Sequence, residues 1–257
     1  MAEHDTGVPV GRLAGKVAII TGAARGQGAE EARLFTQEGA TVILTDVLDE
    51  EGERTAAEID RAVYRRLDVR SEPEWEAVVA EVMETHGRID VLVNNAGIDL
   101  VKKLAATSLE EFERVVAINQ TGTFLGMRTV ANAMIGVEQP CSIVNISSVA
   151  GLEGVANHGA YSGTKFAVTG MTKAAAKEWG RHGIRVNSVH PGLIETPMTE
   201  NLRPFRDSDV RAKAENAIPL RRMGQSIDIA RMVLFLASDE SDYCTGQAFT
   251  VDGGVHP

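Results

Sequence analysis

A tyrosine and a lysine spaced for joint action are the first residues that could carry out chemistry. Tyr161 and Lys165 stand four residues apart in the run YSGTK, and this spacing puts both on one face of a helix predicted over residues 160–179. A phenol has a pKa of about 10, so a neighbouring ammonium that favours tyrosinate would make it useful for proton transfer. The pair by itself is weak evidence, because such spacings arise readily by chance.

Two serines precede this tyrosine. Ser147 and Ser148 follow an apolar segment, 142–146, that predicts a strand. The hydroxyl of Ser148 could hold a substrate oxygen by hydrogen bonding. Ser147 is the alternative, and either serine could instead bond its own backbone in a turn. His158 has no nucleophile elbow or ordered acid to go with it, so we expect a residue at the rim of the site rather than a base.

The segment TGAARGQG, residues 21–28, predicts a turn that binds phosphate. Gly22, Gly26 and Gly28 follow an apolar run and lead into a helix, which lets the backbone approach a pyrophosphate at the helix N-terminus. The spacing GxxxGxG differs from the best-known dinucleotide fingerprint, GxGxxG. Tight strand-to-helix turns also need glycine for their own geometry, so this motif alone does not decide the function.

Acidic and amide side chains follow the next strands. Asp46 ends the second predicted strand, 18 residues after Gly28, where a dinucleotide site places the carboxylate that accepts hydrogen bonds from ribose hydroxyls. A 2′-phosphate there would meet like charge, so Asp46 favours NAD over NADP. A solvated loop acid is the alternative, and Arg25 could serve a 2′-phosphate. Asp68 and Asn95 also follow strands, at the edge where open α/β sheets bind ligands.

The elements that must position these residues alternate along the chain. Strands are predicted at 17–21, 41–45, 63–67, 90–93, 142–146, 184–189 and 247–251, with helical segments between them. This alternation predicts an α/β fold: a Rossmann-type, doubly wound, mostly parallel seven-stranded sheet with helices on both faces. The capping-box patterns at 71–74 and 108–111 mark the starts of two long helices.

No repeat, low-complexity tract or linker divides the chain. We expect a flexible N-terminal tail over residues 1–11 and a single NAD-binding domain over residues 12–257. The polar segment 195–224, which contains three prolines, interrupts the alternation and predicts a mobile substrate lid. Met198, Leu202 and Phe205 could give this lid an apolar inner wall, while its many charged side chains face water.

Composition excludes several classes of protein. The 257 residues include 26 Lys and Arg against 36 Asp and Glu, a formal net charge of −10, and nucleic-acid binding needs a basic face. No apolar run approaches the roughly 20 residues of a membrane span, and we find no secretory signal. Cys141 and Cys244 suit neither metal-ligand spacing nor a disulfide framework. We therefore predict a cytoplasmic protein with no metal site, no nucleic-acid partner and no membrane association.

In combination, these motifs resemble the short-chain dehydrogenase/reductase family. The segments TGAARGQG, LDV, NNAG, INQTG, NISSVAGL, YSGTK, RVNSVHPG and VDGG occur in the family order from about Leu13 to Gly254, with Asp46 in its place. TDVLDEEG, AINQTGTFLGM and SIVNISSVAGL look like the bacterial NAD-dependent 3-alpha/20-beta-hydroxysteroid dehydrogenases of this family. FLASDESDYCTGQAFTVDGG looks equally like 3-oxoacyl-carrier-protein reductases.

The resemblance implies a role for each matching residue. The catalytic set would be Tyr161 as general acid/base, Lys165 as its electrostatic partner and nicotinamide-ribose ligand, Ser148 as holder of the substrate oxygen, and Asn119 in a proton relay through water. The cofactor contacts would be Gly22, Arg25, Gln27 and Gly28 at the pyrophosphate, Asp46 at the ribose, Asp68, Val69 and Asn95 around adenine and its linkage, and Ile194 and Thr196 at the nicotinamide carboxamide. Gln27 departs from the family pattern, which usually has Ile or Leu there, and its amide needs a partner.

The implied reaction is hydride transfer between NAD and the carbon of a secondary alcohol or ketone, without a metal, in a homotetramer. A hydroxysteroid or a similar apolar alcohol is the expected substrate. A terpenoid, sugar or polyol alcohol is an alternative. A 3-oxoacyl-carrier-protein reductase would need NADPH and a basic docking face, which Asp46 and the net charge disfavour. A catalytically silent dinucleotide-binding protein is disfavoured by the intact set of Ser148, Tyr161 and Lys165.

Overall fold

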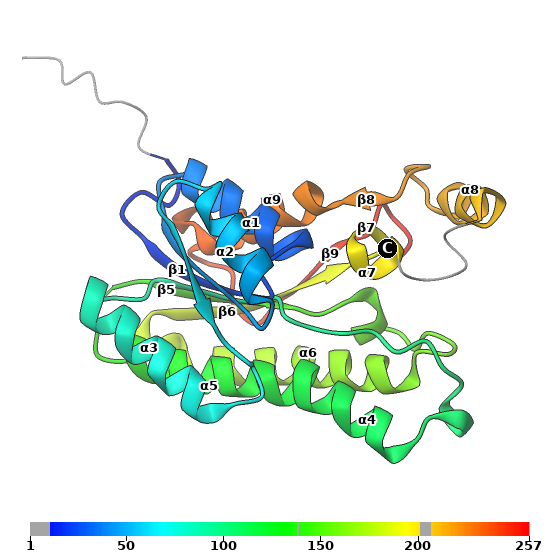
Figure 1. Ribbon diagram of the computed structural model, residues 1–257, viewed down its shortest axis with the longest axis horizontal. Helices are drawn as coiled ribbons and strands as arrows, with labels where there is room; N and C mark the ends of the chain where they lie inside the picture. The colour runs from blue at the N-terminus through cyan, green and yellow to red at the C-terminus, as the bar shows by residue number, and fades with distance from the viewer. Residues whose placement is uncertain (1–10, 138, 201–206, 257) are drawn as a thin grey trace, which may run out of the picture.

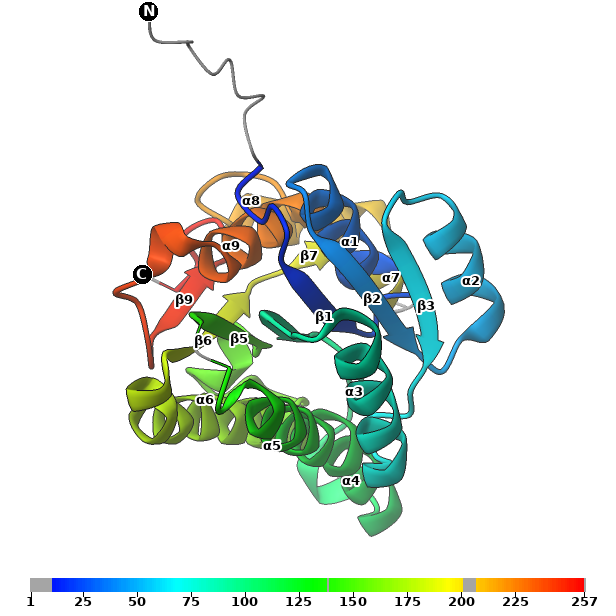
Figure 2. The same ribbon diagram turned by 90° about the vertical axis from the view of Figure 1, so that its left-hand side faces the viewer.

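A parallel sheet forms the centre of the molecule. The computed structural model describes residues 11–137, 139–200 and 207–256. In spatial order the seven strands are β3 (Ala62–Arg66), β2 (Thr41–Asp46), β1 (Val17–Thr21), β4 (Val91–Asn94), β5 (Cys141–Ile146), β6 (Ile184–Pro191) and β9 (Ala248–Val251). Every pairing between them is parallel. The strand order reverses between β1 and β4 (Figure 2), so the predicted doubly wound fold is confirmed.

Helices cover both faces of this sheet. On one face lie α1 (Gly26–Gln37), α2 (Asp49–Ala57) and α9 (Ser226–Ala237), and on the other lie α3 (Glu72–His86), α4 (Leu109–Val115), α5 (Gly122–Met134) and α6 (Gly159–Trp179) (Figures 1 and 2). Successive side chains of a strand point to opposite faces. Ile19 therefore packs in one core with Trp75, whereas Ile20 packs in the other core with Phe35 and Ile229.

The two predicted capping boxes form to different extents. At the start of α4, the Ser108 hydroxyl accepts from the Glu111 amide and the Glu111 carboxylate accepts from the Ser108 amide. At the start of α3, the Ser71 hydroxyl accepts from the Glu74 amide at 3.3 Å. The Glu74 carboxylate instead accepts from the Asp68 amide at 2.8 Å, and thereby fixes the turn that follows β3.

The long helix expected after Ser108 contains a wider turn. A π-helical segment, η2 (Val116–Thr121), joins α4 to α5. Turns of this kind interrupt the regular hydrogen-bond ladder and occur frequently at functional sites. This one carries Asn119, whose side chain is buried.

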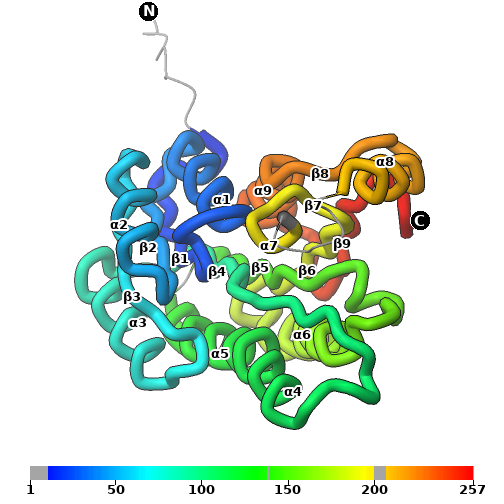
Figure 3. The backbone as a smooth tube through the Cα atoms, turned by 45° about the vertical axis from the view of Figure 1, so that its right-hand side comes forward, coloured from blue at the N-terminus to red at the C-terminus, as the bar shows by residue number. Residues whose placement is uncertain are grey.

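The segment predicted as a lid begins and ends at a second, small sheet. β7 (Ile194–Glu195) pairs in parallel with β8 (Gly224–Gln225), and α7 (Pro197–Glu200) and α8 (Ser208–Ala217) lie between them (Figure 3). Glu195 forms an ion pair with Arg211 of α8 and accepts from the Gln225 side chain at 2.6 Å. The predicted lid residues Leu202 and Phe205, like residues 1–10 of the predicted tail, lie outside the described residues.

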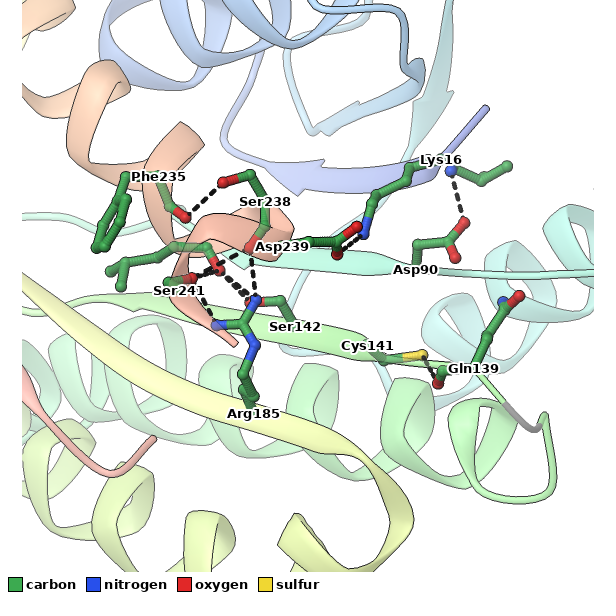
Figure 4. A network of polar contacts seen from close by, with 12 residues as sticks. Lys16, Asp90, Gln139, Cys141, Ser142, Arg185, Phe235, Ser238, Asp239 and Ser241 are labelled. Atoms are coloured by element: carbon green, nitrogen blue, oxygen red, sulfur yellow. Dashed lines mark hydrogen bonds and ion pairs between the residues drawn. The ribbon is translucent and has the colours of Figure 1, made fainter. Parts of the chain in front are cut away.

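An arginine fastens α9 at the amino end of the strands. Arg185 of β6 donates to the carbonyls of Leu236 and Ser238, at 2.9 and 3.0 Å, and to the Ser241 hydroxyl at 2.8 Å (Figure 4). Ser142 of β5 donates to the same Leu236 carbonyl at 2.7 Å. These contacts hold the last turn of α9 at the amino ends of the strands. The carboxyl ends of the strands are left for the candidate site.

Candidate active site

A cleft of about 1360 Å³ runs along the carboxyl ends of the strands. All the predicted site residues line it except Gly28 and Asn119, which pack against lining residues. Drug-sized ligands occupy pockets of roughly 300–1,000 Å³. The cleft is therefore large enough for a dinucleotide together with a second small molecule.

The glycine-rich turn forms the floor of one end of the cleft. Gly22 and Gly26 have φ of +64° and +63°, a region that side chains other than hydrogen rarely allow. A Cβ on Gly28 would lie 2.6 Å from both the Gly22 carbonyl oxygen and the Asn95 amide nitrogen. Asn95 Nδ2 donates to the carbonyls of Thr21 and Gly22, at 2.9 and 3.1 Å. Its side chain thus holds the turn in shape rather than extending along the cleft.

Two side chains next to this turn have polar groups with no partner. Among the described residues, neither the Arg25 guanidinium nor the Gln27 amide has a protein hydrogen-bond or ion-pair partner. Arg25 adopts an extended conformation just before α1 and provides no side-chain cap. It also lines a smaller cavity of about 330 Å³, together with Arg114 and Met198. Both Arg25 and Gln27 are therefore available to a ligand.

The backbone fixes Asp46 at the end of β2. Its carboxylate accepts from the amide of Ala24 at 3.1 Å and from those of Val47 and Leu48 at 2.7 and 3.2 Å. The Tyr64 hydroxyl donates to the Asp46 carbonyl at 2.7 Å. Sequence reasoning did not identify Tyr64, because only the pairing of β2 with β3 brings it beside Asp46.

The next part of the wall follows β3. Asp68 forms an ion pair with Arg70 at 2.5 Å, and hydrogen bonds from this guanidinium lower the pKa of the Asp68 carboxyl. The Val69 carbonyl accepts from the Trp75 indole at 3.1 Å, and a Cβ on Gly122 would lie 2.7 Å from the Val69 side chain. Asp68 therefore lines the cleft while paired with Arg70, and it lies beside the tightly packed Val69.

The structure separates the two candidate serines. The Ser147 hydroxyl donates to the Lys165 carbonyl at 3.0 Å and lies 3.2 Å from the Thr169 hydroxyl, so it is occupied by α6. Ser148 begins a short 3-10 turn, where its hydroxyl accepts from the Ala150 amide at 3.1 Å. The Ser148 hydroxyl is also hydrogen-bonded to the side chain of Tyr161.

Burial governs the proton equilibria of Tyr161 and Lys165. It raises the pKa of Tyr161 to about 12 despite the hydrogen bond from Ser148, which opposes the rise. It lowers the pKa of Lys165 to about 8. Lys165 Nζ donates to the Ile146 carbonyl at 2.7 Å and lies 5.5 Å from the centroid of the Tyr161 ring. Desolvation is thus the largest influence on the phenol, and the predicted effect of the Lys165 ammonium on Tyr161 stays a prediction.

Asn119 clamps the loop after β4. Its Oδ1 accepts from the Ile98 amide and its Nδ2 donates to the Ile98 carbonyl, both at 2.8 Å, with a longer contact to the Thr164 hydroxyl. A Cβ on Gly97 would lie 3.4 Å from Asn119 Oδ1 and 3.7 Å from Lys165 Nζ. The amide is thus committed to positioning the loop that lies against Lys165, and the predicted relay stays a prediction.

A threonine that sequence reasoning missed organises the end of the cleft near β7. The Thr199 hydroxyl donates to the Ile194 carbonyl at 2.7 Å, accepts from the Thr196 amide at 2.9 Å, and lies 3.3 Å from the Thr196 hydroxyl. All three residues line the cleft. The TxxT spacing of residues 196 and 199 was the available signal.

A carboxylate and an imidazole complete the lining beside Tyr161. Asp99 Oδ2 lies 3.3 Å from His158 Nε2, and the His158 ring meets the Tyr161 ring edge to face at 6.3 Å between centroids. The sequence placed His158 at the rim and did not single out Asp99. Both line the cleft, because the loop after β4 pairs with the segment before α6.

Known proteins share this fold and these motifs. A family model described as enoyl-(acyl carrier protein) reductase matches residues 22–256. Over 247 residues the chain is 47% identical to a 3-alpha-(or 20-beta)-hydroxysteroid dehydrogenase of Mycobacterium tuberculosis, covering 95% of this chain and 91% of that protein. The chain belongs to the short-chain dehydrogenase/reductase family.

Further relatives of this short-chain dehydrogenase/reductase agree with that assignment. A trans-4-hydroxycyclohexanecarboxylate dehydrogenase of Sinomonas cyclohexanicum is 42% identical over 253 residues, with 95% of this chain and 93% of that protein covered. The crystal structure of levodione reductase matches with a TM-score of 0.90 and 35% identity, covering 94% of this chain and 98% of the other. The predicted family, fold and enzyme class are therefore confirmed: the chain is an oxidoreductase acting on CH–OH groups, in a family that uses nicotinamide cofactors.

Within the described ranges, no helix combines the length and apolar character needed to cross a bilayer. The same residues contain no group of three or more His, Cys, Asp or Glu side chains arranged to hold a metal ion.

Proposed function

We propose that this short-chain dehydrogenase/reductase is an NAD-dependent dehydrogenase of a hydroxysteroid or a similar apolar cyclic alcohol. The observation that carries the proposal is the meeting of the Ser148 and Tyr161 hydroxyls in a cleft that continues to the glycine-rich turn and Asp46. The likeness to a hydroxysteroid dehydrogenase over nearly the whole chain supports the substrate class.

The cleft has features that suit a nicotinamide dinucleotide. The turn at Gly22 to Gly28 has no room for a Cβ at its last glycine, and α1 starts there with its amide groups directed at a ligand. The Arg25 guanidinium next to it is available for a phosphate. The Asp46 carboxylate, held by backbone amides, would accept ribose hydroxyls and repel a 2′-phosphate, which supports NAD over NADP.

The residues beside Tyr161 would handle the proton of the reacting alcohol. Bound NAD supplies the hydride acceptor for oxidation, and its reduced form supplies the donor for reduction. The Ser148 hydroxyl donates to the substrate oxygen and orients the carbinol carbon. Ionised Tyr161 takes the hydroxyl proton during oxidation, and neutral Tyr161 gives it back during reduction. The Lys165 ammonium, held by the Ile146 carbonyl, contributes positive charge beneath the phenol ring.

The test is the absorbance of NADH formed when the purified protein meets NAD and either a 3-alpha- or a 20-beta-hydroxysteroid, with NADP in a parallel cell. We expect turnover with NAD and little with NADP. A parallel assay with trans-4-hydroxycyclohexanecarboxylate distinguishes a preference for steroids from a preference for alcohols with a single ring. One relative is named for this substrate. No turnover with any secondary alcohol across a wide panel would overturn the dehydrogenase proposal, and preference for NADP would overturn the role of Asp46.

A carrier-protein reductase is the second candidate, favoured by the description of the matching family model. That activity would consume NADPH with a 3-oxoacyl thioester. The Asp46 carboxylate and the net charge of −10 disfavour both the phosphate of NADPH and an acidic carrier protein. Consumption of NADPH with acetoacetyl thioester, but not of NADH, would favour this candidate.

We also propose that the protein is a homotetramer and that it lies in the cytoplasm. Large apolar side chains are exposed on three helices of one face of the sheet, at Leu109, Phe112, Phe124 and Phe166. Such exposed apolar surface is typical of an interface between subunits. Both cysteines are free thiols, which suits a reducing compartment.

A further inference from the structure

The Asp99–His158 pair lies on the wall of the cleft beside Tyr161, and nothing in the proposed chemistry uses it. The two side chains are largely buried, with 13% and 22% of their surfaces exposed. Their segments are fastened together, because the Lys102 amide donates to the Asn157 carbonyl at 2.7 Å. The Asp99 carboxylate also accepts from the Leu100 amide at 2.7 Å. The pair therefore has a fixed place relative to Tyr161.

The two ring nitrogens of His158 both face hydrogen-bond acceptors. Nε2 faces the Asp99 carboxylate at 3.3 Å and Nδ1 faces the Ala156 carbonyl at 3.1 Å. Both partners are hydrogen-bond acceptors, and a neutral imidazole has only one N–H to donate. The N–H that faces Asp99 can donate to the carboxylate and so offset part of its negative charge.

Asp99 is the carboxylate that acts on the reacting groups. Its charge opposes ionisation of Tyr161 and favours the ammonium form of Lys165. The other charged groups nearby are partnered or exposed: Glu111 is paired with Lys102 at 2.7 Å, and Glu153 is half exposed, 4.0 Å from His256. A carboxylate in a partly dry cleft interacts more strongly than one that water screens.

We propose that Asp99 and His158 are positioning residues that control the Tyr161 hydroxyl electrostatically from the substrate side of the cleft. The Asp99 carboxylate holds the proton on the phenol, and the His158 ring, through its contact with that carboxylate, offsets part of this effect. The site is thereby biased toward Tyr161 as a proton donor, the form that carbonyl reduction requires. This inference rests on the proposed function, in which Tyr161 moves the substrate proton.

The experiment titrates Tyr161 directly and does not need a substrate. The chain has three tyrosines, so protein labelled with ¹³C at the tyrosine Cζ and saturated with NAD gives three NMR resonances. Tyr161→Phe identifies the one of interest. We expect Asp99→Asn to lower its titration midpoint by about half to one pH unit, Asp99→Glu to leave it in place, and His158→Gln to raise it.

The opposite signs expected for the two positions separate electrostatics from packing. Glu153→Gln is the matched control, since it removes an exposed carboxylate of the same cleft wall, and it should not move the midpoint. An unchanged midpoint in Asp99→Asn, or the same shift in Asp99→Glu as in Asp99→Asn, overturns the inference. If Asp99→Asn does not fold, His158→Gln decides: a midpoint that fails to rise overturns it.

The two proposals can fail independently. The expected shifts without turnover of any alcohol would support the control by Asp99 and His158 and overturn the dehydrogenase. Turnover without the shifts would support the dehydrogenase and overturn the control by Asp99 and His158. If an alcohol that the protein oxidises is found, the pH profile of kcat/KM for its oxidation should move to lower pH in Asp99→Asn, in parallel with the NMR midpoint.

Discussion

Lys165 is a buried ionisable residue and Tyr161 a half-buried one, and their partial removal from water favours the neutral form of each. The Tyr161 hydroxyl is hydrogen-bonded to Ser148, and the Lys165 ammonium donates to the Ile146 carbonyl. Removal of one polar atom from either residue therefore removes a defined contact at the site.

Removal of the Tyr161 hydroxyl tests its role. Tyr161→Phe should reduce kcat by at least about 100-fold, because general acid–base catalysis typically contributes 10²–10⁴-fold, while the affinity for NADH stays near that of the wild type. The rate of NADH formation and the quenching of protein fluorescence by NADH measure the two quantities. Tyr243→Phe is the control, since that ring is 99% exposed. Retained turnover in Tyr161→Phe would contradict the assignment.

The burial of Glu31 in α1 predicts how the free energy of unfolding depends on pH. It is fully buried, and neither carboxylate oxygen has a hydrogen-bond partner among the described residues. Burial raises the pKa of Glu31 well above its ordinary value. Above the ordinary carboxyl pKa, the unfolded chain releases this proton while the folded chain keeps it. The free energy of unfolding therefore falls by up to about 1.4 kcal/mol per pH unit until the raised pKa is reached.

Glu31→Gln removes this dependence. Urea unfolding at pH 5, 7 and 9 should show that the variant gains stability over the wild type as the pH rises. Glu30→Gln, a change of the neighbouring carboxylate on the solvent side of α1, should leave the pH dependence unchanged. Parallel curves for the wild type and Glu31→Gln would show that Glu31 does not carry the effect.

At the scale of the elements, Arg185 binds the carboxyl end of α9 together with the hydroxyls of Ser142 and Ser241. Helices leave their last carbonyls without intrahelical partners, and Arg185 fills that need for Leu236 and Ser238 (Figure 4). Burial lowers the pKa of Arg185, but the fork of donors keeps its contacts with α9. Helix α9 is thus held at the amino ends of the strands, away from the cleft at their carboxyl ends.

Arg185→Met keeps most of the apolar stem and removes the donors. We expect a loss of about 2–3 kcal/mol in the free energy of unfolding, because buried carbonyl oxygens lose a charged donor. Urea denaturation measures the change. The control is Arg181→Met, whose guanidinium contacts only its exposed neighbour His182 among the described residues, and it should change stability by less than about 0.5 kcal/mol. Equal effects of the two variants would contradict the role of Arg185.

At the scale of the whole molecule, the helices below the sheet in Figure 1 present apolar side chains to the surface. Phe112 of α4 is 41% exposed and Phe124 of α5 is 45% exposed. A charge placed at an apolar interface is costly because it must be desolvated. This surface therefore predicts the assembly of the enzyme.

Phe112→Glu combined with Phe124→Glu should lower the mass of the assembly measured by light scattering, from that of four subunits to that of two or one. Val63→Glu on the edge strand β3, where the side chain is 40% exposed, makes the same kind of change elsewhere and should leave the mass unaltered. A wild-type protein that runs as a monomer would refute the tetramer at once.

Local sequence patterns determined much of this protein. Alternating β-branched runs and helical segments were sufficient to predict the strands and the doubly wound sheet, because strand and helix periods are local properties. The parallel arrangement then brought the loops after β1, β2, β4 and β5 to one edge, as strand order in such folds requires. Gly22, Asp46 and Ser148 could be named from the sequence for that reason, whereas Tyr161 was named from its spacing to Lys165 and from the family resemblance.

Tertiary structure alone decided the environments and the pairings. The family resemblance had named Ser148, but only the packing shows that α6 engages the Ser147 hydroxyl. The neutral bias of Tyr161 likewise depends on how much water the fold excludes. The Asn119–Ile98 and Asp99–His158 contacts join segments that are distant in sequence. Spacing along a chain fixes which residues share an element, whereas solvent exclusion and the approach of separate elements arise only when the chain packs.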